Sequence, residues 1–139
     1  MASSGAILAI DHGTIRTGFA ATDESRILSA PLDVFRGAGD GEELLQHIAG
    51  LLDERRVSLF LVGLPYNMDG SEGPRAAEVR AFAQRLAQRF PTPELRFQDE
   101  RLSTKEADEL LAAAGHFGAD RKARRDSWSA LVILRDYLA

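Results

Sequence analysis

Four acidic residues stand where a folded chain would present them to a ligand. Asp11 ends an apolar run, Asp99 and Glu100 close a later alternating segment, and Asp126 begins the apolar part of the last predicted helix. Ligands of open α/β sheets gather outside the carboxyl ends of the strands, so Asp11, Asp99 and Glu100 would meet at one rim, which Asp126 could reach from the start of its helix. Clustered carboxylates repel one another unless cations neutralise them, and their oxygen atoms select Mg²⁺ or Mn²⁺. The spacing therefore predicts a metal site and phosphate chemistry.

Each carboxylate also has a purely structural interpretation. Asp11 precedes His-Gly and would serve equally as a turn residue at the exit of a strand. Asp99 and Glu100 precede a predicted helix, whose N-terminus favours acidic residues. An isolated aspartate on a helix, such as Asp126, is usually solvated. The residues alone leave these alternatives open.

The hydrophobic pattern predicts the elements that position these residues. Residues 6–11 and 57–63 are nearly unbroken apolar runs, typical of central strands covered on both faces. Three further strands are expected, and Pro31 assigns one of them to a sheet edge because proline cannot donate to the ladder. They cover residues 15–21, 26–37 and 94–98. The predicted fold class is α/β with a mixed sheet.

Four helices complete the predicted order βββαβαβαα. Apolar spacing predicts them from about residue 42 to 56, 74 to 90, 103 to 115 and 124 to 139. Asp40 with Glu43, and Ser103 with Glu106, have the spacing of capping boxes. The arginines of the second helix do not fall on one stripe, so they predict no groove.

Composition limits the possible functions. The chain has 139 residues, of which 45% are hydrophobic and 27% charged, as in one globular domain. Cysteine is absent, which excludes disulfides and thiolate sites and suits the cytoplasm. No segment has the pattern of a signal peptide or a membrane span, so no membrane association is expected. The net charge of -4 means that any surface for nucleic acid must be local.

Four motifs, in order, resemble the YqgF family, also called RuvX. They are DHGTIRTGFAATD, LVGLPYNMDGSEGPRA, DERLSTKEA and DSWSALVIL, and together they extend the resemblance over almost the whole chain. The resemblance implies a ribonuclease H-like fold in one domain over residues 1–139. Its sheet has five strands, of which the second is antiparallel to the rest, and is flanked by helices.

The resemblance also implies a function. Asp11, Glu100 and Asp126 would be the catalytic, metal-binding carboxylates, with Asp99 as an alternative to Glu100. The implied reaction is phosphodiester hydrolysis by two Mg²⁺ or Mn²⁺ ions, one activating water and the other stabilising the leaving oxygen. Trimming of ribosomal RNA precursors is the leading assignment. The alternatives are a Holliday junction resolvase, which would act as a dimer, and a non-catalytic transcription-associated factor that binds nucleic acid.

The implied partner is nucleic acid, either an RNA precursor or branched DNA, bound by a monomer or homodimer. Gly13 would let the backbone turn tightly beside a phosphate, and Gly18 would relieve crowding in the second strand. His12 should face away from the carboxylates because successive strand residues alternate. The side chains expected to contact nucleic acid are Thr14, Arg16, Tyr66, Asn67, Arg101, Arg121, Lys122, Arg124 and Arg125.

Overall fold

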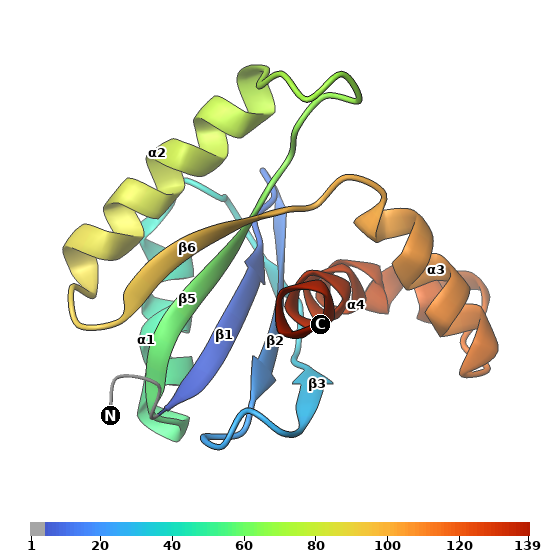
Figure 1. The fold of residues 1–139 in the computed structure, drawn as a ribbon, viewed down its shortest axis with the longest axis horizontal. Coiled ribbons are helices and arrows are strands. Elements are labelled where there is room, and N and C mark those ends of the chain that lie inside the picture. The colour runs from blue at the N-terminus through green and yellow to red at the C-terminus, as the bar shows by residue number, and fades with distance from the viewer. Residues whose placement is uncertain (1–4) are drawn as a thin grey trace.

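A mixed β-sheet runs through the middle of the protein, and helices cover both of its faces (Figure 1). The computed structural model describes residues 5–139. The strands are β1 (Ala6–Asp11), β2 (Arg16–Thr22), β3 (Ser29–Pro31), β4 (Phe35–Arg36), β5 (Val57–Leu64) and β6 (Glu94–Asp99). The helices are α1 (Glu42–Glu54), α2 (Pro74–Arg89), α3 (Ser103–Ala113) and α4 (Gly118–Leu138).

The strand order is β3-β2-β1-β5-β6. Strands β1, β5 and β6 are parallel, whereas β2 is antiparallel to β1. This arrangement confirms the predicted mixed sheet with an antiparallel second strand, and Pro31 lies in the edge strand β3 as expected. The carboxyl ends of β1, β5 and β6 therefore meet at one rim of the sheet.

The predicted third strand, residues 26–37, is divided in two. Strand β3 pairs with the end of β2, and β4 pairs with its beginning. Between them, the Phe19 backbone N–H donates a hydrogen bond to the Ser127 hydroxyl of α4, at 3.1 Å. A helix side chain thus takes the place that a continuous third strand would occupy, so the sheet has one more strand than predicted.

Alternation along the strands separates two hydrophobic cores. Leu8 and Ile10 face α1 and α2, together with other buried side chains of β2 and β5. Ile7 and Ala9 face α4 on the opposite side. Asp11 continues the second series, so its side chain lies on the α4 face at the end of β1. α3 packs against α4 and extends away from the sheet (Figure 1).

Helix starts differ from the sequence prediction in three places. Neither predicted capping box forms, because α1 begins after Gly41 and α3 begins after Leu102, each without a side-chain cap. Ser103 lies inside α3 and is buried, and Leu102 precedes it in a left-handed conformation, with φ 68°. α4 begins at Gly118, well before residue 124. Its first turns are polar and show no apolar periodicity, and ion pairs stabilise them instead.

Within residues 5–139, none of the helices combines the length and apolar character that crossing a membrane requires.

Candidate active site

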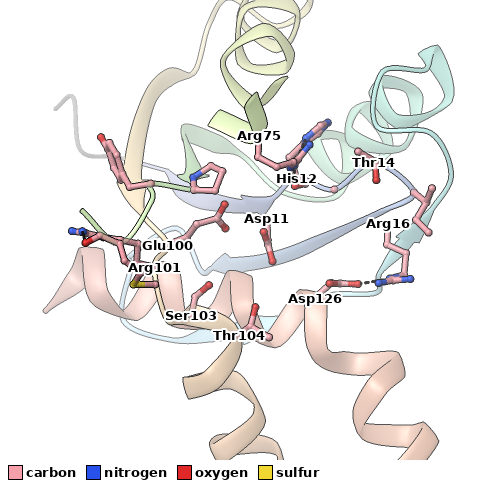
Figure 2. A pocket seen from close by; sticks show the side chains of 15 residues that line it. Asp11, His12, Thr14, Arg16, Arg75, Glu100, Arg101, Ser103, Thr104 and Asp126 are labelled. Carbon is pink, nitrogen blue, oxygen red and sulfur yellow. Dashed lines mark hydrogen bonds and ion pairs between the residues drawn. The ribbon is translucent and has the colours of Figure 1, made fainter. Parts of the chain in front are cut away.

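A cavity of about 440 Å³ opens where the carboxyl ends of the parallel strands meet. The end of β1, the turn after it, the loop after β5, the turn after β6 and the middle of α4 all contribute to its wall (Figure 2). The cavity contains all three predicted catalytic carboxylates. Its lining includes Asp11, Thr14, Arg16, Tyr66, Arg75, Glu100, Arg101 and Asp126.

Two glycines beside Asp11 allow the other two carboxylates to approach it. Gly18 of β2 is the direct partner of Asp11 in the ladder, and a Cβ there would lie 2.0 Å from the backbone oxygen of Asp126. Gly63 of β5 follows the partner of Ile10, and a Cβ there would lie 2.8 Å from a carboxylate oxygen of Glu100. The missing side chains leave room for the α4 backbone on one side of Asp11 and for the Glu100 side chain on the other.

The Asp11 and Glu100 carboxyl groups lie close enough to influence each other's pKa. Burial is the largest influence on Asp11 and raises its pKa well above the ordinary value, and the nearby charge of Glu100 raises it further. Burial likewise raises the pKa of Glu100. The positive charge of Arg75 opposes both shifts. Two neighbouring buried carboxylates with too little positive charge around them make a site that favours a cation.

The donor set fits a hard divalent cation. Its atoms are carboxylate oxygens, the ligands that Mg²⁺ and Mn²⁺ prefer, and the cavity gives them access to solvent. Asp126, however, is turned toward Arg16, whose Nε donates to the Asp126 Oδ2 at 2.9 Å (Figure 2). In residues 5–139 no three acidic or histidine side chains are grouped tightly enough to bind one ion. A cation held by all three carboxylates would therefore require Asp126 to leave Arg16.

Asp99 and Glu100 have different surroundings, although they are adjacent. Asp99 accepts hydrogen bonds from the backbone N–H and the guanidinium of Arg101, at 2.7 to 2.9 Å. The Arg101 side chain thereby lowers the pKa of Asp99. Glu100 instead lines the cavity with Asp11. Of the two, Glu100 is therefore the residue that shares the cavity with Asp11, and its role as the cation ligand stays a prediction.

The turn after β1 brings further polar groups to the rim. A Cβ at Gly13 would lie 2.0 Å from the Arg16 carbonyl oxygen, so the tight turn requires glycine. The turn directs Thr14 and Arg16 to the cavity wall. On the loop after β5, Tyr66 lines the cavity, and the Arg101 guanidinium carbon lies 5.8 Å from its ring centre.

Asn67 and the basic run lie outside the cavity lining. The Asn67 amide donates to the Ser71 hydroxyl at 3.0 Å and stabilises its own loop. Among the basic residues of α4, Arg121 and Arg125 form ion pairs with Asp108 of α3, and Arg124 pairs with Asp120. Contact of nucleic acid with these residues, including Lys122, stays a prediction.

Arg75 is a cavity residue that sequence reasoning missed. It is the second residue of α2, and it lies above the Asp11 and Glu100 pair (Figure 2). The spacing of the arginines along α2 does not single out Arg75, because it reaches the cavity from the first turn of the helix and not through a periodic pattern. The available signal was its position just after the loop at the carboxyl end of a parallel strand, where ligands bind.

Raising the pH is expected to destabilise the metal-free protein through Asp11. Because the folded state raises the pKa of Asp11, the folded protein binds more protons than the unfolded chain. The resulting contribution to the free energy of unfolding is full below the ordinary pKa of 3.8 and is lost as the pH rises through the folded value. Other carboxylates with lowered pKa values, such as Asp99, act in the opposite direction. The measurement is therefore the difference in unfolding free energy between wild type and Asp11→Asn, in EDTA, across pH. A difference that does not change with pH would contradict the expectation.

The family model described as "RuvX: Holliday junction resolvase" matches residues 5–139. Among curated proteins, a "Putative pre-16S rRNA nuclease" of Sodalis glossinidius is 43% identical, over 99% of this chain and 96% of its own length. A protein of the same name from Escherichia coli is 41% identical, over 96% of each chain.

Solved structures with a similar fold are distant in sequence. Thermus thermophilus RuvC in complex with a Holliday junction substrate has a TM-score of 0.54 at 12% identity, covering 94% of this chain and 95% of that one. The Fowlpox virus resolvase in complex with Holliday junction DNA has a TM-score of 0.54 at 8% identity, covering 96% of each chain. These likenesses concern the fold alone.

Proposed function

The chain belongs to the RuvX family, and from this premise we propose that it is a nuclease that hydrolyses phosphodiester bonds in ribosomal RNA precursors with the help of divalent cations. The observation that carries the proposal is the convergence of Asp11 and Glu100 in one cavity, with Asp126 beside them on α4. The oxygen ligands favour Mg²⁺ or Mn²⁺.

Asp11, Glu100 and Asp126 are the residues that would hold the cations. A bound divalent cation supplies Lewis acidity, which activates water for attack and stabilises the charge that builds on the phosphate. Asp11 and Glu100 already lie near each other, whereas Asp126 would have to leave its ion pair with Arg16 to hold a cation together with them. The Arg16 guanidinium and the Thr14 hydroxyl would then be available to donate hydrogen bonds to a phosphate at the rim.

The name carried by the curated relatives favours ribosomal RNA precursors as the substrate. A protein with this role would act in the cytoplasm, as one nuclease domain over residues 1–139. The family model that matches the chain is described as a Holliday junction resolvase, which favours a second candidate function, the cleavage of Holliday junctions. A cation site acts on the phosphate and does not distinguish ribose from deoxyribose. Contacts to the 2′-hydroxyl, or recognition of the shape of the junction, must therefore distinguish RNA from Holliday junctions as the substrate. A junction resolvase must cut two symmetric strands and would act as a homodimer, whereas RNA trimming is open to a monomer.

Cleavage of matched labelled substrates tests the proposal. Purified protein would be incubated in Mn²⁺, Mg²⁺ or EDTA with single-stranded RNA of precursor sequence, single-stranded DNA, duplexes and a four-way junction. We expect cutting of the RNA that EDTA abolishes. Symmetric cutting of the junction, with the RNA left intact, would replace RNA processing with resolution. Binding without cutting in either metal would contradict a nuclease and favour a non-catalytic factor.

A further inference from the structure

Arg75 is held firmly at the carboxyl end of β1. Its Nη2 donates to the backbone oxygen of His12 at 2.6 Å and lies 3.3 Å from the Nδ1 of the same residue. These contacts draw the guanidinium from the first turn of α2 to the residue that follows Asp11. The Arg75 side chain keeps 38% of its surface accessible, and it lines the cavity that contains both carboxylates.

His12 is itself fixed in a way that suits Arg75. Its Nε2 lies 2.8 Å from the Gly39 carbonyl oxygen, and its ring stacks on Phe82 with 4.3 Å between the centres. A carbonyl only accepts hydrogen bonds, so the hydrogen-bond network assigns the ring proton to Nε2. Nδ1 is then left as an acceptor, which points toward Arg75. The His12 ring packs against Phe82 on the face of the sheet opposite to Asp11, as the strand alternation predicted, and His12 also contributes to the cavity wall.

The guanidinium retains hydrogen-bonding capacity. Arginine has five N–H donors, and the hydrogen bonds of Arg75 all use Nη2. Nη1 is buried and makes no hydrogen bond, although the Glu78 carboxylate lies 3.3 Å away in an ion pair. Because Nη1 is enclosed beside Glu78 and Nη2 is engaged with His12, the Nε N–H is the donor that remains for a ligand in the cavity. A preorganised guanidinium with such a donor beside a carboxylate site suits a non-bridging phosphate oxygen.

We propose that Arg75, held by its hydrogen bonds to His12, contacts a phosphate of the nucleic-acid substrate beside Asp11 and Glu100. The inference rests on the nuclease function proposed above and adds a substrate-binding residue to it. Arg75 fixes the phosphate from the α2 side of the cavity, and Arg16 faces it from the β2 side. The positive charge of Arg75 also offsets the repulsion between the substrate and the two carboxylates before a cation binds.

Binding of a labelled single-stranded RNA in EDTA, over a series of salt concentrations, tests this role without cleavage. Arg75→Gln is expected to weaken binding about tenfold, the loss typical of a charged hydrogen bond. The slope of log affinity against log salt should fall by about 0.7, as for one lost phosphate contact on a single strand. Arg75→Lys should keep the salt slope but lose part of the affinity, because lysine retains the charge without the fork.

Arg89→Gln is the matched control. It removes the same charge from the same helix, fourteen residues further along, or about 21 Å at the rise of an α-helix, and Arg89 lies outside the cavity lining, paired with Glu42 of α1. Its RNA affinity and salt slope should match those of wild type. Mn²⁺ titration and denaturant unfolding of each variant complete the set.

Three results would overturn the proposal. Wild-type affinity and salt slope in Arg75→Gln would remove the phosphate contact. A change confined to Mn²⁺ affinity would make Arg75 a counter-charge for the carboxylates only. Equal losses in Arg75→Gln and Arg75→Lys, together with lower unfolding stability in both, would make it a packing residue. Failure of the wild type to bind or cut any nucleic acid would contradict the nuclease function itself, and this inference with it.

Discussion

Replacement of Asp11 with asparagine is expected to reduce cleavage by about 10³-fold or more, the effect of losing roughly 4 kcal/mol of transition-state stabilisation. The substitution preserves volume and removes the charge that lies between Glu100 and Asp126. Because the folded state raises the pKa of Asp11, its ionised form is unfavourable in the metal-free protein. The unfolding free energy of Asp11→Asn in EDTA should therefore equal or exceed that of wild type at neutral pH.

Two measurements on Asp11→Asn separate an effect on catalysis from an effect on folding. Initial cleavage rates in Mn²⁺ report on catalysis, and denaturant unfolding in EDTA gives the free energy of unfolding. A variant that is stable and inactive fits a carboxylate retained for catalysis at the expense of stability. Full activity would remove Asp11 from the mechanism, and inactivity with a large loss of stability would assign it to the fold.

Gly18→Ala is expected to damage both the fold and the site. The added Cβ would stand 2.0 Å from the Asp126 backbone oxygen and 2.6 Å from the Ser127 nitrogen, so α4 must move off β2. Overpacking against a backbone costs about 3 kcal/mol of unfolding free energy, and any shift of α4 carries Asp126 away from Asp11. Cleavage should fall by at least about 10²-fold, since small misplacements of catalytic groups have effects of this size.

Gly50→Ala is the matched control for this prediction. Gly50 lies in α1, and a Cβ there meets nothing within 4 Å. The same substitution should stabilise the protein by about 1 kcal/mol, the difference in helix propensity between the two residues, and leave cleavage unchanged. Denaturant titrations and cleavage rates of both variants check the pair. Wild-type stability in Gly18→Ala would contradict the close approach of α4 to β2.

The strands were predictable because alternation and apolar runs are local signals. The rim at the carboxyl ends of β1 and β6 followed from them, and with it the approach of Asp99 or Glu100 to Asp11, whereas the choice of Glu100 came from the family resemblance. The place of Asp126 required the family resemblance, since its approach depends on contact between α4 and Gly18, far apart in sequence. The capping boxes were wrong because Leu102 and Gly41, and not the expected side chains, precede the helices.

Other features of the site depend on contacts between residues far apart in the sequence, so no local sequence pattern predicts them. Gly63 reads as the end of an apolar strand, and only the structure shows that the Glu100 carboxylate occupies the space beside it. In the sequence, Arg75 is one of several arginines on α2 and would be expected to be exposed. Only the structure shows that it hydrogen-bonds to His12 and lines the cavity. The ion pair between Arg16 and Asp126 joins residues 110 positions apart.

The central claim is that Asp11, Glu100 and Asp126 form a divalent-cation site. Calorimetric titration of Mn²⁺ into metal-free protein tests it most directly, with wild type, Glu100→Gln and Asp99→Asn compared at neutral pH. We expect wild type and Asp99→Asn to bind Mn²⁺ with similar affinity, because Asp99 lies outside the cavity lining and is engaged with Arg101. Glu100→Gln should bind at least about tenfold more weakly, since it loses a charged ligand. Unchanged binding in Glu100→Gln, or loss of binding only in Asp99→Asn, would contradict the account.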